Sequence, residues 1–246
     1  MVTNSRYKVI TIDNSIVLYD ANLISTPTLS LFDAKQHDVE KNNISTEQQR
    51  TGIGRAKVTY FSSDNRKLVL KHYYRGGMIA SVLKDSYFGL SIEHSRAFRE
   101  WKLLKIMKGF GLPVPDAVAA RIEKKTLTYR ADLITQEIEN IKTLSDSLSI
   151  NKLKPSMWKK IGACIKSFHE HDIYHADLNA RNILVENDGG IYLIDFDNSY
   201  VRKGSGTWKR ANLARLKRSL LKFKANTETF NFEESDWDLL LEGYLV

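Results

Sequence analysis

The chain has 246 residues, of which 42% are hydrophobic and 27% charged, a composition that is typical of a globular protein and excludes a mostly disordered chain. No window approaches the roughly 18 uninterrupted apolar residues of a membrane span, and the N-terminus lacks the apolar stretch and the cleavage site of a signal peptide, so we expect a cytoplasmic protein. The one cysteine, Cys164, excludes an internal disulfide and a thiolate metal cluster. Its position on an apolar helical face, with Ile161 and Phe168, predicts a buried side chain rather than a catalytic thiol.

The net charge of +8 is unevenly distributed. Residues 202–224 hold nine Lys or Arg and no acidic residue. In residues 225–246, all charged residues are acidic. A basic segment of this kind attracts an anionic partner, such as nucleic acid, an acidic membrane surface or a phosphorylated substrate. A solvated helix face explains it equally well. Both interpretations stay open at this point.

The first half of the chain is expected to be strand-rich. One helix is predicted over 95–111, with Glu100, Leu103, Leu104 and Met107 on one face, and residues 33–50 are read as a loop or a short helix. The expected strands in chain order are 8–12, 15–19, 56–63, 67–74, 117–123 and 126–138, with a turn at Asp64-Asn65.

The second half is expected to be helical, with one hairpin. The predicted helices are 154–172, 214–223 and 235–245, and the hairpin pairs 182–186 with 191–195 around the turn Asn187-Asp-Gly-Gly190. These patterns predict an α+β protein with a β-rich N-lobe over residues 1–139 and a helical C-lobe over 140–246.

A group of polar residues in the second half has the spacing that phosphoryl transfer needs. His175-Ala-Asp177 follows a predicted helix, Asn182 comes five residues after Asp177, and Asp195 ends the hairpin. Asp177 suits the proton acceptor, while Asn182 and Asp195 offer the hard oxygen ligands that Mg²⁺ prefers. Because a tight hairpin brings its ends together, we expect Asn182 and Asp195 to meet. Loop or helix capping is the alternative for Asp177 and for Asn182.

These residues resemble the catalytic loop and the metal-binding segment of the protein-kinase-like superfamily, with Asp195-Phe196-Asp197 carrying Asp in place of the usual Gly. Lys71 in Val-Leu-Lys resembles the lysine of the third strand, and Glu100 its helix partner. The resemblance implies a two-lobed protein-kinase-like fold, ATP and Mg²⁺ as cofactors, and further nucleotide contacts from Gly52, Gly54, Arg55 and the backbone of Glu137 and Ile138. An exposed strand lysine remains the alternative for Lys71.

From about residue 50 the chain is also similar to bacterial 3-deoxy-D-manno-octulosonic acid (Kdo) kinases, in stretches such as FREWKLL, HADLNARNIL, LIDFDNS and WKRANLARLKRS. The resemblance implies transfer of the ATP γ-phosphate to the 4-hydroxyl of Kdo on a lipid A precursor, at the cytoplasmic side of the inner membrane. This chain has Lys71 where these kinases often have Arg, and Arg75 is the second candidate for a phosphate contact.

The basic segment then has a more specific interpretation. Trp208, Phe223 and Trp237 lie beside it, and its cations are candidates for binding substrate phosphates or anionic membrane headgroups; they are Lys209, Arg210, Arg215 and Arg218, with Lys217 beside them. Three rival functions remain: a kinase of another acceptor, such as heptose or a small molecule, a basic nucleic-acid-binding protein, and a catalytically inactive kinase-like scaffold. No nucleic-acid partner is expected, because base-stacking aromatics do not alternate with cations on a strand.

Overall fold

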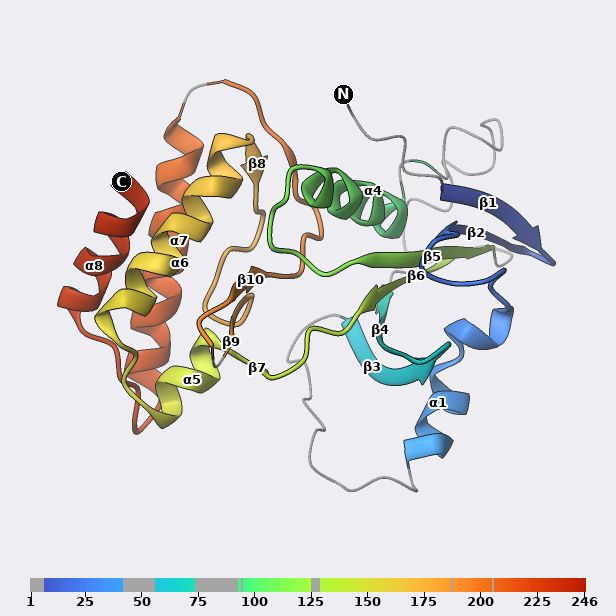
Figure 1. Cartoon of the computed structure of the whole chain (residues 1–246), viewed down its shortest axis with the longest axis horizontal. Coiled ribbons are helices and arrows are strands. Elements are labelled where there is room, and N and C mark those ends of the chain that lie inside the picture. The colour runs from blue at the N-terminus through green and yellow to red at the C-terminus, as the bar shows by residue number, and fades with distance from the viewer. Residues whose placement is uncertain are drawn as a thin grey trace. The chain divides into compact units, whose positions relative to one another are not determined.

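The computed structural model describes residues 7–41, 56–73, 93, 95–124, 129–186, 188–204 and 206–246. The chain divides into two compact units. The N-terminal unit comprises residues 1–105 and 116–137, and the C-terminal unit comprises residues 106–115 and 138–246. The first is built mainly on a sheet and the second mainly on helices, which confirms the predicted α+β fold class (Figure 1).

The N-terminal unit contains a six-stranded sheet in the order β1-β2-β5-β6-β4-β3, in which all neighbours are antiparallel. Asp64 and Asn65 both have positive φ, 50° and 57°, as a two-residue turn of type I′ requires, so the predicted hairpin forms with the predicted turn. The strands are β1 (Tyr7–Ile12), β2 (Ser15–Asp20), β3 (Ala56–Ser63), β4 (Arg66–Tyr73), β5 (Ala117–Lys124) and β6 (Tyr129–Gln136).

The two short helices that follow β2 complete the hydrophobic core on one side of this sheet. Side chains alternate along a strand, so Leu68 and Leu70 of β4 share a face, and both are fully buried. They belong to a hydrophobic cluster with Phe32, which is supplied by the short helix η1 (Leu29–Phe32). The next helix, α1 (Ala34–Lys41), places His37 in a stacked contact with Phe61 of β3, with ring centroids 3.9 Å apart.

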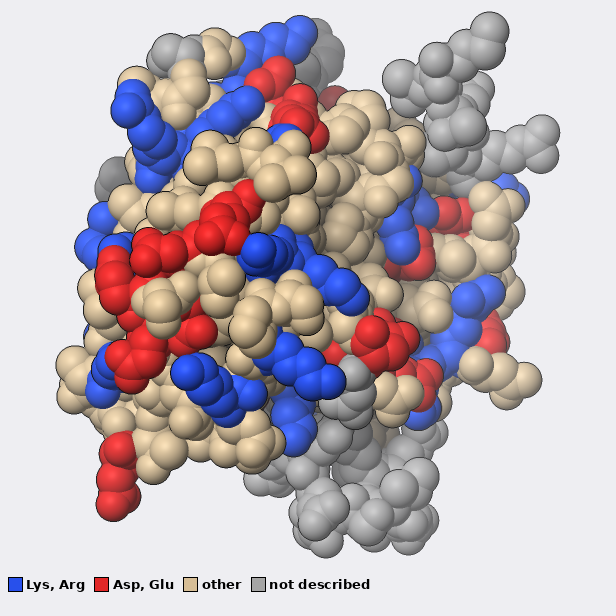
Figure 2. Space-filling view, turned by 60° about the vertical axis from the view of Figure 1, so that its left-hand side comes forward, with Lys and Arg blue, Asp and Glu red and all other residues tan. Residues whose placement is uncertain are grey.

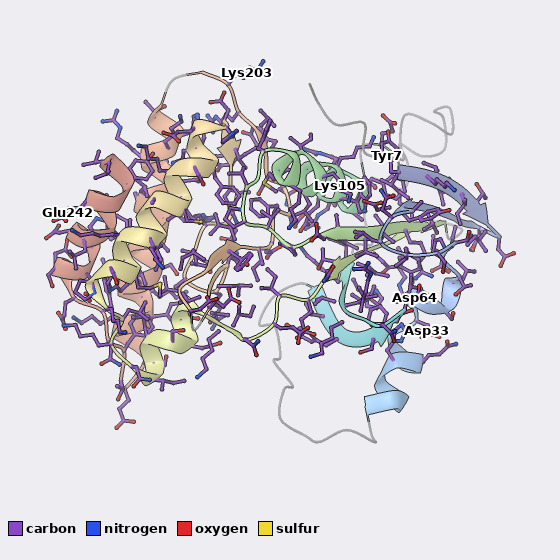
Figure 3. The ribbon with its side chains drawn as sticks, in the orientation of Figure 1. Tyr7, Asp33, Asp64, Lys105, Lys203 and Glu242 are labelled. Carbon is purple, nitrogen blue, oxygen red and sulfur yellow. The ribbon has the colours of Figure 1, made fainter. Side chains whose placement is uncertain are left out.

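The helix α4 (Arg96–Gly109) forms where the sequence predicts it, and Gly111, with φ of 73°, follows its end. The rings of Trp101 and Tyr7 meet edge to face with their centroids 5.6 Å apart, and Lys105 forms an ion pair with Asp20 of β2. Figure 3 labels Tyr7 and Lys105 in this region. The first two strands are therefore anchored to α4 as well as to the sheet.

A buried charged group crosses the middle strands of the sheet. The Asp132 carboxylate on β6 is fully buried and accepts hydrogen bonds from Arg121 Nε at 2.8 Å and from the His72 ring. Burial raises the pKa of Asp132, but the hydrogen bond from His72 and the charge of Arg121 outweigh that effect, so its pKa lies below the ordinary value. Each charge of the group has partners, so loss of one member would leave an uncompensated buried charge.

The C-terminal unit is mostly helical. Two long helices approach so closely that glycine is required at the crossing: a Cβ on Gly162 would lie 2.0 Å from the carbonyl oxygen of Leu240, and one on Gly243 would lie 2.0 Å from that of Lys159. The elements are β7 (Ile141–Thr143), α5 (Leu144–Ile150), α6 (Pro155–Glu170), β8 (Ile173–Tyr174), β9 (Ile183–Glu186), β10 (Ile191–Leu193), β11 (Tyr200–Val201), α7 (Thr207–Asn226) and α8 (Glu234–Leu245).

Two helices of the C-terminal unit differ from the predictions. The helix α5 was not predicted, although Thr143 caps it by accepting a hydrogen bond from the Asp146 N–H at 3.0 Å. The helix α7 begins at Thr207, seven residues before the predicted start. Its first turn contains the buried Trp208, so tertiary burial extends the helix beyond its strongest apolar pattern. Among the residues that the structure describes, no helix has the length and apolar character needed to cross a bilayer.

Candidate active site

Lys71 and Glu100 are in contact in the N-terminal unit, as their predicted elements suggested. The Lys71 Nζ atom lies 3.1 and 3.0 Å from the two carboxylate oxygens of Glu100. Glu100 is 4% exposed, so its charge needs partners, and the Tyr73 hydroxyl donates a further hydrogen bond to it. The Lys71 side chain keeps 16% exposure. This arrangement fixes one ammonium group on the face of β4 opposite the core leucines.

The segment predicted to bind adenine follows β6 directly. The Glu137 backbone N–H donates to the Lys67 carbonyl at 2.9 Å, which continues the pairing of β6 with β4. An adenine contact from Glu137 would therefore use its carbonyl oxygen and not its N–H. Four other predicted contacts, Gly52, Gly54, Arg55 and Arg75, lie outside the described residues.

In the C-terminal unit, His175 holds together two segments that are far apart in sequence. Its ring is buried; Nδ1 accepts a hydrogen bond from the Asp177 N–H at 3.1 Å, and Nε2 lies 3.0 Å from the Ile194 carbonyl oxygen. A carbonyl only accepts, so the ring proton resides on Nε2. The buried Phe196 packs against the same ring at 4.6 Å. His175 thus ties the Asp177 loop to the segment that carries Asp195.

The hairpin brings Asn182 next to the segment of Asp195. Ile183 pairs with Leu193, and the Ile194 N–H donates to the Asn182 carbonyl at 3.0 Å. The Asn182 Nδ2 group donates to the Asp177 carbonyl at 2.9 Å, so a metal ion would use the amide oxygen of this side chain. Asp195 lies two residues after the end of β10, is exposed and has a φ of 63°, a left-handed conformation that costs about 1 kcal/mol or more.

The Asp177 carboxylate is open to solvent, with 55% of the side chain exposed, yet both of its oxygens have neighbours. Asn179 Nδ2 donates to Oδ2 at 3.1 Å, and a guanidinium nitrogen of Arg215 lies 3.6 Å from Oδ1. The role of Asn179 was not predicted. Its position two residues after the aspartate was the available signal, since a short amide side chain commonly bonds to groups two residues away.

One face of α7 supports the backbone of this loop. Asn212 is buried and bonds to both backbone groups of His175: Nδ2 donates to its carbonyl at 2.9 Å, and Oδ1 accepts from its N–H at 3.3 Å. The Ser219 hydroxyl accepts from the Ala180 N–H at 3.2 Å. These two supports were also not predicted, because the sequence shows only scattered polar residues along a helix.

The exposed charge of α7 is smaller than its sequence indicates. Lys217 pairs with Glu234 and Lys224 pairs with Glu233, so acids that follow the basic segment in sequence offset part of it. Lys209, Arg210 and Arg218 are at least partly exposed. Figure 2 shows basic and acidic side chains interspersed on the face that it presents.

The aromatic part of the membrane interpretation is wrong. Trp208 and Trp237 are 3% and 6% exposed, and both are core residues of the C-terminal unit. Phe223 is partly buried and stacks on Phe230, with ring centroids 5.6 Å apart. These aromatic side chains are close to cations in the sequence. In the structure they pack against other residues of the C-terminal unit and are not available to a lipid surface.

The sequence predicts a buried Cys164, whereas in the structure its side chain is only partly buried. Burial raises the pKa of its thiol to about 12, so it is not a thiolate nucleophile at neutral pH. The nearby His169 does not contact it in a catalytic pair; instead its ring nitrogens lie 2.8 Å from the Tyr244 hydroxyl and 3.4 Å from Asn212 Oδ1.

These contacts place a buried histidine, an exposed aspartate, a metal-compatible amide and a second aspartate in one compact framework. A family model described as the lipopolysaccharide kinase (Kdo/WaaP) family matches residues 41–244 of the chain. The chain belongs to this family. Its matched region contains every described residue of the framework.

Individual relatives agree with the family. The chain is 42% identical over 179 residues to the 3-deoxy-D-manno-octulosonic acid kinase of Actinobacillus succinogenes, covering 71% of this chain and 74% of the relative. It is 34% identical over 232 residues to the protein of the same name from Photobacterium profundum, covering 94% and 95%. A solved structure described as WaaP in complex with acyl carrier protein is similar in fold, with a TM-score of 0.55 at 16% identity, covering 90% of this chain and 87% of that one.

Proposed function

We propose that this member of the Kdo/WaaP family is an ATP-dependent 3-deoxy-D-manno-octulosonic acid kinase of lipopolysaccharide core biosynthesis. The observation that carries the proposal is the loop of residues 175–182. In this loop the side chains of His175 and Asn182 both bond to the backbone of Asp177 and hold it in place. The acceptor is a Kdo-bearing lipid A precursor, and the 4-hydroxyl of Kdo receives the phosphate. The relatives named Kdo kinase support this acceptor class.

In the proposed reaction Asp177 accepts the proton of the acceptor hydroxyl while that oxygen bonds to the γ-phosphorus of ATP. The bond from the γ-phosphorus to the bridging oxygen breaks, and ADP leaves with the electron pair. Lys71, steadied by Glu100, holds the donor phosphates. The proton transfer contributes about 10²–10⁴-fold to the rate, and positioning and charge stabilisation supply most of the remainder.

Asn182 and Asp195 would hold Mg²⁺. The residues fit this ion, because one offers a neutral amide oxygen and the other an exposed carboxylate, and the hairpin brings the two segments together. When bound, the ion neutralises phosphate charge as the transfer proceeds. The carbonyl of Glu137 and the backbone of Ile138 are the proposed adenine contacts, and Gly52, Gly54 and Arg55 the proposed cover over the phosphates.

We further propose that the enzyme works at the cytoplasmic side of the inner membrane as a peripheral protein, with residues 1–139 and 140–246 as its two lobes. Because Trp208 of α7 and Trp237 of α8 are buried, the attraction to anionic headgroups or to acceptor phosphates would rest on cations, among them Lys209, Arg210 and Arg218. Arg75 is a proposed second phosphate contact.

The decisive experiment incubates the protein with ATP, Mg²⁺ and a Kdo-bearing lipid A precursor and measures the product by mass spectrometry, with Asp177→Ala in parallel. We expect the mass of one phosphate to be added by the wild type and not by the variant, while both bind ATP. If the wild type binds ATP but adds no phosphate, the acceptor assignment is wrong, and heptose-bearing acceptors are the next to test. If Asp177→Ala retains full activity, the assignment of Asp177 is wrong.

A further inference from the structure

Helix α7 presents a row of polar side chains to the Asp177 loop. Asn212, Arg215 and Ser219 are spaced by three and four residues, so they lie on one helical face. Each of them bonds to the loop backbone: Asn212 to His175, Arg215 to Ala176 and Ser219 to Ala180. The buried Leu213, Leu216 and Leu220 fix the helix beneath them. This face therefore acts as a rigid support for the loop.

Arg215 differs from the other two because it also reaches the reacting group. Its Nε donates to the Ala176 carbonyl at 3.3 Å, and its terminal nitrogen lies 3.6 Å from Oδ1 of Asp177. The opposite oxygen, Oδ2, accepts from Asn179 at 3.1 Å. The carboxylate is therefore held from both sides, once by its own loop and once by α7.

We infer that Arg215 is a positioning residue for phosphate transfer, which sets the orientation of the Asp177 carboxylate relative to its own backbone. The inference rests on the proposed role of Asp177 as proton acceptor. It also reassigns Arg215, since the sequence suggested a cation for substrate or membrane phosphates. The planar guanidinium can bond a carbonyl with one nitrogen while it faces a carboxylate with another, and a lysine ammonium lacks this geometry.

A structural role does not account for this contact. The Arg215 side chain is 44% exposed and that of Asp177 is 55% exposed, and ion pairs in such positions contribute little to folding stability. The reaction rate is more sensitive to this contact than folding stability is, because displacing a catalytic carboxylate by about 1 Å can reduce the rate on the order of a hundredfold. The contact therefore matters for the reaction rather than for the fold.

The test is a double-mutant cycle on kcat, with Arg215→Met, Asp177→Asn and the double variant, using ATP, Mg²⁺ and the Kdo-bearing lipid A precursor. Methionine keeps the apolar stem and the helix propensity of position 215. We expect Arg215→Met to lower kcat by roughly 10–100-fold with less than about a threefold change in either KM. In the Asp177→Asn background the same substitution is expected to cost less than about threefold, because the group that Arg215 positions is no longer a base.

Two controls complete the test. Lys159→Met removes another exposed helical cation, whose Nζ lies 2.7 Å from Glu242 (labelled in Figure 3), and is expected to leave kcat unchanged. Arg215→Lys is expected to keep the acceptor KM but recover less than half of the lost kcat. The inference would be overturned if Arg215→Met raised the acceptor KM and left kcat unchanged. It would also be overturned if Arg215→Met lowered kcat by the same factor in the wild type and in Asp177→Asn. Either result would leave the proposed function standing. An Asp177→Asn variant with wild-type kcat would overturn both the inference and the proposed role of Asp177 as proton acceptor, while the kinase activity itself would stand.

Discussion

At the residue scale, the Lys71–Glu100 pair depends on a third side chain. Glu100 is 4% exposed and accepts hydrogen bonds from Lys71 and from the Tyr73 hydroxyl, and the Tyr73 ring also lies 4.8 Å from the lysine Nζ. A buried carboxylate with two donors has a defined orientation, and that orientation determines where the ammonium group of Lys71 stands.

We predict that Tyr73→Phe lowers kcat/KM for ATP about tenfold. The substitution keeps the ring and removes one hydrogen bond to a charged group, worth about 1.5 kcal/mol. Initial rates at varied ATP concentration measure the effect. Tyr19→Phe on β2 serves as the control, because Tyr19 is a buried tyrosine of the same sheet and belongs to the core cluster. Equal kcat/KM values for the two variants would contradict a role for Tyr73 in orienting Glu100.

At the scale of elements, the contact between α6 and α8 determines how closely the two helices of the C-terminal unit pack. Gly162 faces the backbone of Leu240, and Gly243 faces the backbone of Lys159. A methyl group at either position would meet main-chain atoms, which do not move aside as a flexible side chain does. The helices would have to separate, and the apolar face of α6 would lose contacts.

We therefore predict that Gly162→Ala and Gly243→Ala each lower the free energy of unfolding by about 2–3 kcal/mol, as measured by chemical denaturation. The matched control is Gly109→Ala at the end of α4, where an added Cβ has no described atom within 4 Å. Its expected effect is neutral or stabilising by up to about 1 kcal/mol, because alanine is the better helix former. A loss at Gly109 equal to that at Gly162 would show that steric overlap is not the cause.

At the scale of the whole molecule, the stability of the C-terminal unit should depend on pH through His169. Burial lowers the pKa of its ring from 6.5 to about 4, with the charge of Lys209 acting in the same direction and the hydrogen bond to Asn212 opposing them. The ring is therefore neutral in the folded state near pH 7.

Between about pH 6.5 and 4 the unfolded chain binds a proton at His169 that the folded protein does not. Stability therefore rises with pH across this window and is lost on acidification, by at most about 3 kcal/mol from this group. We predict that Tm falls between pH 7 and 4 more steeply in the wild type than in His169→Gln, which cannot titrate at this position. Parallel pH profiles for the two proteins would refute the assignment.

The positions of the long strands along the chain and the core of the candidate site follow from local patterns. Asp64-Asn65 needs only its own backbone preferences to form the turn, and Glu100 shares a helical face with leucines, so its need for a cation is visible in the sequence. Asn182 and the residue before Asp195 meet because the hairpin between them is short. The roles of these residues in catalysis stay predictions.

The sequence by itself determined most of the longer strands and helices and the hairpin that joins the two proposed metal ligands, because each depends on residues close together in the chain. Tertiary structure decided the burial of Trp208 and Trp237, the pairing of basic α7 with acidic α8 and the contact of Arg215 with Asp177. A periodic pattern shows which face of a helix is polar, but it does not show what that face meets. Only the packing of α7 on the Asp177 loop separates a cation that faces solvent from one that orients a catalytic group.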